Sequence, residues 1–261
     1  MSGLARHDLG DTGGPPALFI HCALGRSRDW TRLRAALTAP LRARAFDLPG
    51  HGASPAWDGQ GDFHSICTAH AREMLAGDAP AILIGHSFGA TVALRLALEQ
   101  PQAVRALVLI EPVLFAAARG TPEHDDNARH DAAFAQAMAA GDGHAAARGF
   151  LARWGAGPGF DALAAPEQER LAAMMGLIEA AAPAIHDDNA GMLAPGGLEA
   201  LHRPCLLLHG AASPPVAAAI ARNLEVRMPD AGCVEIAAAG HMLPLTHAPA
   251  VAQAIDGFLA R

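Results

Sequence analysis

The chain is poor in charge and in long apolar runs. Charged residues make up 17% of its 261 residues, the formal net charge is −7, and no Lys/Arg cluster is long enough to follow a phosphate backbone. Nucleic acid is therefore not expected as a partner. No apolar run approaches the ~18 residues that span a bilayer, and the first residues lack the basic and apolar regions of a signal peptide. These absences predict a cytoplasmic protein without a membrane partner.

Cysteine is scarce as well. Cys22, Cys67, Cys205 and Cys233 are widely separated and form no Cys-x-x-Cys pair. This spacing argues against a disulfide framework and against a zinc site. Buried free thiols in a reducing compartment are the better interpretation.

Apolar residues are plentiful by contrast. They make up 51% of the chain, enough for a large buried core and against disorder. The length suits one α/β core with an inserted segment, or at most two small domains.

Short apolar runs alternate with helix-like stretches along most of the chain. This alternation predicts an α/β fold, a mostly parallel sheet with helices on both faces. The clearest helices outside the middle of the chain are 90–100, 215–223 and 249–260. Ligands of such sheets bind beyond the carboxyl ends of the strands. The residues that end each apolar run are therefore the first candidates for a functional site. The expected strands are residues 17–21, 43–47, 81–85, 106–111, 205–209 and 233–237.

The stretch 115–200 differs from its flanks because it is rich in alanine, lacks a convincing strand and is interrupted by Gly-Pro and Pro-Gly turns. Residues 132–140, 145–154 and 167–182 look helical. We interpret 115–200 as a helical lid inserted between two parts of the core, 1–114 and 201–261; further packing helices are the alternative. Its large apolar side chains either line a pocket or form the lid's own core: Phe115, Phe150, Trp154, Met174, Met175 and Met192.

The pentapeptide G-H-S-F-G at residues 85–89 carries the strongest chemical signal. It follows an apolar strand and opens a helix, as a sharp turn that exposes Ser87 above the sheet would. Small residues flank the serine because such a turn is crowded. The following helix N-terminus offers free N–H groups to a developing oxyanion. We expect Ser87 to be a nucleophile.

A serine nucleophile needs a base within hydrogen-bond reach. His241 lies in a Gly-His-Met loop after the last predicted strand and before the final helix, a position that separates it from the other 13 histidines. We expect His241 to be the general base. His86 stands next to the nucleophile and is expected to pack or tune rather than to act as base.

The loop at 21–25 follows the first predicted strand and can supply an oxyanion donor. The backbone N–H of Ala23 is the first choice and that of Leu24 the alternative, with Phe88 N–H as the second donor. His21 is expected to brace this loop. The turn D-L-P-G-H-G-A-S at 47–54 is interpreted as a rigid scaffold on the same edge.

Three His/Asp groups, at 124–126, 130–131 and 186–188, could suggest a metal site. Their internal spacing is unlike that of a helical ligand pair, so a solvated acidic surface is the better interpretation. We expect no metal and no cofactor.

Taken together, the motifs at 21–23, 47–52, 85–89 and 240–242 resemble those of the α/β-hydrolase superfamily, in its branch of small bacterial serine esterases with a lid. They span almost the whole chain and are more specific for the fold than for the reaction. Related dehalogenases and epoxide hydrolases use Asp where this chain has Ser87, which disfavours those reactions.

One departure concerns the acid that should orient His241. The resemblance implies an Asp in a Gly-x-x-Asp turn before the final strand, but that turn ends in Ser213. Glu111 is the best replacement, because it ends the strand after that of Ser87 and keeps the order nucleophile, acid, base. The alternative is that Glu111 binds backbone amides at the base of the lid.

The expected reaction is hydrolysis of a carboxylic ester or related acyl bond of a small molecule, by a monomer or homodimer. Leu24, His86, Phe115 and Met242 are expected to contact the substrate. Two alternatives remain open: hydrolysis of a carbon–carbon bond by the same Ser–His pair, and a non-catalytic ligand-binding protein that has lost the triad acid.

Overall fold

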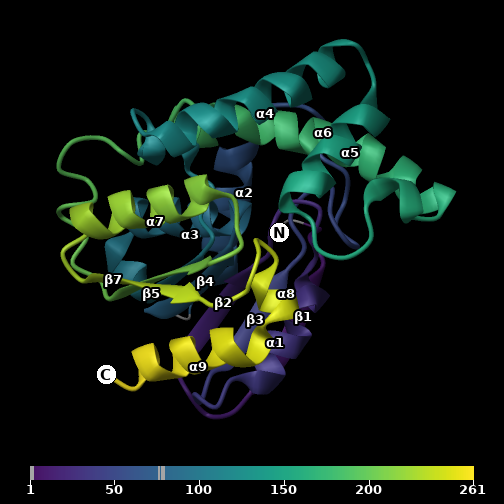
Figure 1. Cartoon of the computed structure of the whole chain (residues 1–261). Coiled ribbons are helices and arrows are strands. Elements are labelled where there is room, and N and C mark those ends of the chain that lie inside the picture. Colours follow the sequence, from purple (N-terminus) through teal and green to yellow (C-terminus); the bar gives the residue numbers. More distant parts are fainter. Residues whose placement is uncertain (1–2, 76, 78–79) are drawn as a thin grey trace.

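A computed structural model of the chain describes residues 3–75, 77 and 80–261. In this part of the chain one seven-stranded sheet has the order β1-β3-β2-β4-β5-β6-β7 (Figure 1). β1 runs antiparallel to β3 and every other pairing is parallel. The strands are β1 (Arg6–Asp11), β2 (Pro16–Ile20), β3 (Arg42–Phe46), β4 (Ala81–His86), β5 (Val104–Ile110), β6 (Cys205–Gly210) and β7 (Ala231–Ile236).

The predicted α/β architecture is confirmed, and each of the six expected strands has both ends within two residues of an observed one. The expectation missed β1. Its sequence, RHDLGD, is polar and mostly exposed, since it is an edge strand with one hydrogen-bonded neighbour. An edge strand does not need the apolar run that marks a strand buried on both faces.

Successive residues of the buried strands point to opposite faces of the sheet. In β2, Leu18 and Ile20 pack into the core beneath α2 (Phe63–Leu75), α3 (Phe88–Glu99) and α7 (Pro215–Arg227). Ala17 and Phe19 pack into the core on the other face, beneath α1 (Thr31–Ala36), α8 (Leu243–Thr246) and α9 (Ala248–Leu259). Figure 1 shows these two helical layers on either side of the sheet.

Three helices occupy the middle of the chain: α4 (Pro122–Ala139), α5 (Gly143–Trp154) and α6 (Ala165–Ile185). They lie together beyond one end of the sheet (Figure 1). α4 begins ten residues before the expected start, because Thr121 caps it by accepting a hydrogen bond from His124 N–H and Pro122 fills its first position. A small core joins them: Ala146, Ala147, Phe160, Leu171 and Met175 are buried in it, and Phe134 and Met138 of α4 pack against it.

No helix in the described part of the chain combines the length and the apolarity needed to cross a membrane. The four cysteines are free thiols: Cys22, Cys67 and Cys205 are buried, and Cys233 is half-buried. Burial raises the pKa of the Cys22 thiol to about 12. That thiol is therefore protonated and a poor nucleophile, although it lies in the loop beside Ser87.

Truncating a buried and an exposed apolar side chain should change the free energy of unfolding by very different amounts. Leu207 in β6 is fully buried, whereas Val226 at the end of α7 is 86% exposed. Leu207→Ala should lower the free energy of unfolding by about 2–5 kcal/mol through lost burial and a cavity. Val226→Ala should change it by less than about 0.5 kcal/mol. Urea unfolding followed by circular dichroism measures both, and equal losses would contradict this placement of the core.

Candidate active site

Ser87 lies in the turn between β4 and α3. Its backbone has φ 57° and ψ −120°, a region that non-glycine residues rarely adopt. Ser87 N–H donates to the carbonyl oxygen of Ile110 in β5 at 2.8 Å, which helps to hold the strained turn. The strand and the helix therefore fix the position of the hydroxyl before any ligand binds.

The two glycines of this turn are required by close backbone contacts. A Cβ atom at Gly85 would lie 2.4 Å from the carbonyl oxygen of Gly89. A Cβ atom at Gly89 would lie 2.2 Å from the carbonyl oxygen of Ile20 in β2. The G-x-S-x-G pattern is thus a steric condition for packing α3 against the strands.

His241 approaches Ser87 from the loop between β7 and α8. Its Nε2 lies 3.0 Å from Ser87 Oγ, and the residue is 6% exposed. The edge of the Trp154 ring packs against it at a centroid distance of 4.8 Å. These contacts hold the imidazole at hydrogen-bond distance from the hydroxyl and shield it from water.

Glu111 lies directly after β5 and is fully buried, with φ 50°. His241 Nδ1 donates to Glu111 Oε2 at 2.9 Å. An ionised carboxylate can only accept, so this bond assigns the proton to Nδ1 and leaves Nε2 as the acceptor that faces Ser87. Ser87, His241 and Glu111 therefore form one continuous hydrogen-bonded chain.

The contacts of Ser213 show how a carboxylate after β5 can take the place of the expected acid after β6. Its hydroxyl donates to Glu111 Oε1 at 2.7 Å, and Gly210 N–H donates to the same oxygen at 2.7 Å. β5 and β6 are neighbours in the sheet, so a carboxylate that follows either strand can reach the same histidine. The position where the family resemblance implies an Asp instead supplies a hydrogen bond to the carboxylate.

The two residues expected to donate to the oxyanion line the same cavity as Ser87. Ala23 and Phe88 both line the cavity above the serine, and neither of their N–H groups donates to another residue that the structure describes. Leu24 N–H is occupied, because it donates to His51 Nε2 at 3.1 Å. This bond leaves Ala23 as the available amide of the loop.

A rigid scaffold supports that loop from below, as the D-L-P-G-H-G-A-S turn implied. His21 Nε2 accepts a hydrogen bond from Leu48 N–H at 2.9 Å, and His21 Nδ1 donates to the Cys22 carbonyl at 2.7 Å. The Asp47 carboxylate accepts from Ser27 N–H at 2.6 Å and from Ala53 N–H at 2.8 Å. The loop and the turn are therefore joined by buried hydrogen bonds at several points.

His86 contacts the backbone of His241 and does not line the cavity. Its Nε2 donates to the His241 carbonyl at 2.9 Å. Burial, with the nearby His241, lowers the His86 pKa to about 3, so the ring is neutral at physiological pH. It lies outside the cavity lining, as do Leu24 and Met242, whereas Phe115 lines the cavity.

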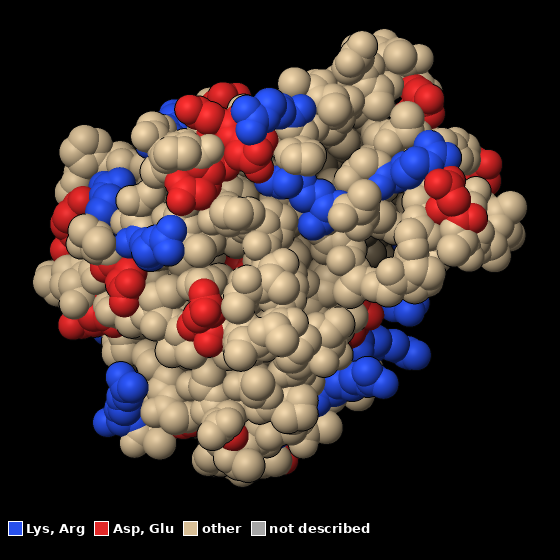
Figure 2. Space-filling view, in the orientation of Figure 1, with Lys and Arg blue, Asp and Glu red and all other residues tan. Residues whose placement is uncertain are grey.

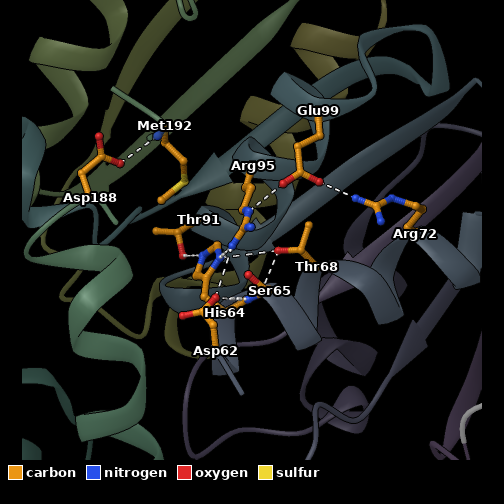
Figure 3. A network of polar contacts seen from close by, with 10 residues as sticks. All are labelled: Asp62, His64, Ser65, Thr68, Arg72, Thr91, Arg95, Glu99, Asp188 and Met192. Atoms are coloured by element: carbon orange, nitrogen blue, oxygen red, sulfur yellow. Dashed lines mark hydrogen bonds and ion pairs between the residues drawn. The ribbon is translucent and has the colours of Figure 1, made fainter. Parts of the chain in front are cut away.

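A second polar chain reaches the first turn of α3 from its far side (Figure 3). Arg95 donates to His64 Nδ1 at 3.2 Å, and His64 Nε2 donates to Thr91 Oγ1 at 3.1 Å. Thr91 then donates to the Phe88 carbonyl at 2.7 Å. Burial, together with the positive charge of Arg95, lowers the His64 pKa to about 4. This chain fixes the helix turn that presents the Phe88 amide.

A cavity of about 350 Å³ opens above Ser87 and His241, beneath α4, α5 and α6. Its apolar wall includes Phe115, Phe150 and Trp154. Met175 and Met192 are buried in the cores instead. Some of the large apolar residues of the middle segment therefore line the cavity, and others are buried in the hydrophobic cores.

Polar residues of this cavity were not recognised in the sequence. Asp131 and His186 line it, with Asp131 from α4 and His186 directly after α6. Both side chains are partly exposed, at 38% for Asp131 and 29% for His186, and other acidic and basic side chains gather over the outer side of α4 (Figure 2). Among the described residues, no group of three His, Cys, Asp or Glu side chains is placed to hold a metal ion.

The Ser–His–Glu hydrogen-bonded chain lies at the carboxyl ends of parallel strands, where α/β sheets bind their ligands. Its geometry is that of a catalytic triad. A model of the alpha/beta hydrolase family matches residues 17–254. The chain belongs to the alpha/beta hydrolase family.

Individual relatives agree with this assignment. The chain is 31% identical to a pimeloyl-(acyl-carrier protein) methyl ester esterase of Aromatoleum aromaticum over 84% of this chain and 87% of that protein. It is 38% identical to Lipase LipV of Mycobacterium tuberculosis, a match that spans 40% of each chain. A solved hydrolase from Pseudomonas aeruginosa PA01 is 26% identical, with a TM-score of 0.73 over 99% of this chain and 94% of that one.

Four buried histidines predict a steep loss of stability in mild acid. Burial lowers the pKa of His21 and His64 to about 4, and that of His51 and His86 to about 3. Between the ordinary value of 6.5 and these folded values, the unfolded chain binds more protons, so acid favours unfolding. From about pH 7.5 to about pH 5.5 the free energy of unfolding should fall by roughly 5 kcal/mol.

Urea titrations at the two pH values measure this loss. His64→Gln should reduce the pH-dependent part by about one histidine's share, roughly 1.3 kcal/mol over the whole range from pH 7.5 to pH 5.5. His144→Gln is the matched control, because that side chain is 42% exposed. Flat stability across this range would mean that these histidines are protonated in the folded protein.

Proposed function

We propose that the chain is a serine esterase that cleaves a small carboxylic ester through an acyl-enzyme on Ser87. The observation that carries the proposal is the Ser87–His241–Glu111 chain, with contacts of 3.0 and 2.9 Å. Serine becomes nucleophilic when a base accepts its proton during attack. The buried carboxylate supplies the orientation and the negative charge that this base needs.

In the first half-reaction, Ser87 Oγ attacks the ester carbonyl while His241 Nε2 takes its proton. The N–H groups of Phe88 and Ala23 donate to the oxyanion that develops. His241 then gives the proton to the leaving alcohol, and the acyl group stays on Ser87. In the second half-reaction His241 activates a water molecule, which releases the acid and returns the proton to Ser87.

Residues 115–200 would act as the lid over this site. The support is that α4, α5 and α6 carry the cavity wall above Ser87 and join in a small core of their own. An apolar roof of this kind excludes water and strengthens the electrostatic contacts at the oxyanion. The lid would therefore contribute both to selectivity and to the rate.

The competing functions have less support. A non-catalytic binding role was suggested by the missing Asp at position 213, and the bonds from Ser213 and His241 to Glu111 remove that argument. Carbon–carbon hydrolysis would use the same Ser–His pair. Ester cleavage is favoured because the proteins that the chain resembles include a lipase and a methyl ester esterase.

Glu111→Gln tests the proposed acid. The amide would present an N–H to His241 Nδ1 and would favour the tautomer whose Nε2 carries a proton, which cannot accept from Ser87. Turnover of a short ester should fall by at least about a hundredfold, since triad acids contribute on that scale. Stopped assays on p-nitrophenyl acetate measure the loss.

Ser213→Ala is the matched control, because it removes one hydrogen bond to Glu111 but leaves the charge. Its turnover should fall by about tenfold or less. Circular dichroism verifies that both variants are folded. Unchanged turnover in a folded Glu111→Gln variant would return Glu111 to a purely structural role.

A further inference from the structure

The cavity above Ser87 has one polar end. A series of ring contacts forms its wall: His241 packs against Trp154 at 4.8 Å, Trp154 against Phe115 at 5.8 Å, and Phe115 stacks on His186 at 4.6 Å. Asp131 lies next to His186, with Oδ2 3.6 Å from His186 Nδ1. The carboxylate is therefore separated from the reacting serine by an apolar wall.

Asp131 is held rigidly through only one of its oxygens. Asn127, which is 1% exposed, donates from Nδ2 to Asp131 Oδ2 at 2.8 Å. Arg153 Nε fixes that amide by donating to Asn127 Oδ1 at 3.1 Å. Asp131 Oδ1 accepts no hydrogen bond from any residue in the described part of the chain. Asp131 lines the cavity, and this oxygen is available to accept a hydrogen bond from a ligand.

Arg153 brings one positive charge to the cavity lining. Its guanidinium pairs with Asp126, with Nη2 3.7 Å from Oδ2. Burial lowers the pKa of His186, although Asp131 opposes the shift, so the ring is neutral near pH 7. Glu179 also lines the cavity. This end of the cavity therefore has two carboxylates and one guanidinium in its lining, and the unpaired Asp131 Oδ1 suits a hydrogen-bond donor better than an anion.

We propose that Asp131 forms a distal subsite for substrates that carry a hydrogen-bond donor, a hydroxyl or an ammonium group, away from the ester bond. The inference rests on the proposed esterase function and specifies its substrate class. The Asp131 side chain is 38% exposed in the free protein. A bound substrate without the donor would cover the carboxylate oxygen and leave it unpaired, so this acceptor discriminates between substrates. The apolar wall binds the carbon chain between this donor and the ester.

Two matched series of esters test the subsite. In one, ethyl esters of a straight-chain acid carry a methyl, hydroxyl, ammonium or carboxylate group at the far end of the acyl chain. In the other, acetate esters carry the same groups on the alcohol. In at least one series, kcat/KM for the hydroxyl or the ammonium ester should exceed that of the methyl ester about tenfold, and the carboxylate should be poorest.

The ratio of kcat/KM between donor and methyl esters is compared within each variant, so that changes in overall activity cancel. Asp131→Leu should bring the ratio to about one or below. Asp131→Asn, which keeps the shape and an acceptor, should lower the ammonium preference about tenfold and the hydroxyl preference less. Asp125→Asn removes a charge from the same helix at a side chain that is 80% exposed, and it should keep both ratios.

Equal rates for methyl and donor esters in both series, or a preference that survives in Asp131→Leu, would overturn the subsite. If the wild type hydrolyses these esters without preferring donors, the subsite alone fails. If it hydrolyses none of the esters and a fluorophosphonate does not label Ser87, the proposed function fails as well.

Discussion

The hydrogen bond between Glu111 and His241 is the interaction on which the site depends. A fully buried carboxylate is costly unless its oxygens are paired. Here Gly210, Ser213 and His241 donate to it. The same contacts fix the imidazole tautomer and tie together β5, β6 and the loop after β7. Orientation of the base and stability of this sheet edge thus rest on one group.

The remaining parts of the site are positioned by the sheet rather than by flexible loops. Ser87, Glu111 and the loop of Ala23 all follow the carboxyl ends of neighbouring strands, β4, β5 and β2. Close contacts at Gly85 and Gly89 bring α3 against these strands. Neutral buried histidines hold the two segments that carry the proposed oxyanion donors, since His51 accepts from Leu24 N–H and His64 donates to Thr91 Oγ1. Preorganised donors of this kind are the condition for strong electrostatic stabilisation in the proposed reaction.

Much of this arrangement could be predicted from the sequence. The apolar runs located six strands, and the strand-end rule pointed to Ser87 and Glu111 as neighbours, because parallel strands present their carboxyl ends at one edge. β1 was missed since an exposed edge strand has no apolar run. The early start of α4 was missed because the Thr121-Pro122 cap lies in a polar stretch.

The polar end of the cavity could not be predicted. Asp131 and His186 are distant in sequence and stand among other His and Asp residues that face solvent. Which of them turns inward depends on how α4 and α6 pack against each other, and helical spacing in an alanine-rich segment defines no single apolar face. The family resemblance implied an Asp at position 213, which is the usual position of the acid in the family. It could not indicate that Glu111, after another strand, takes this place.

The most direct test of the account is the reactivity of Ser87. Intact-mass analysis after exposure to a small fluorophosphonate should show a single adduct on the wild type and none on Ser87→Ala. This result is expected because His241, oriented by Glu111, activates that hydroxyl alone. A folded wild type that acquires no adduct, or an adduct that persists in Ser87→Ala, would contradict the claim that this hydrogen-bonded chain makes an active nucleophile.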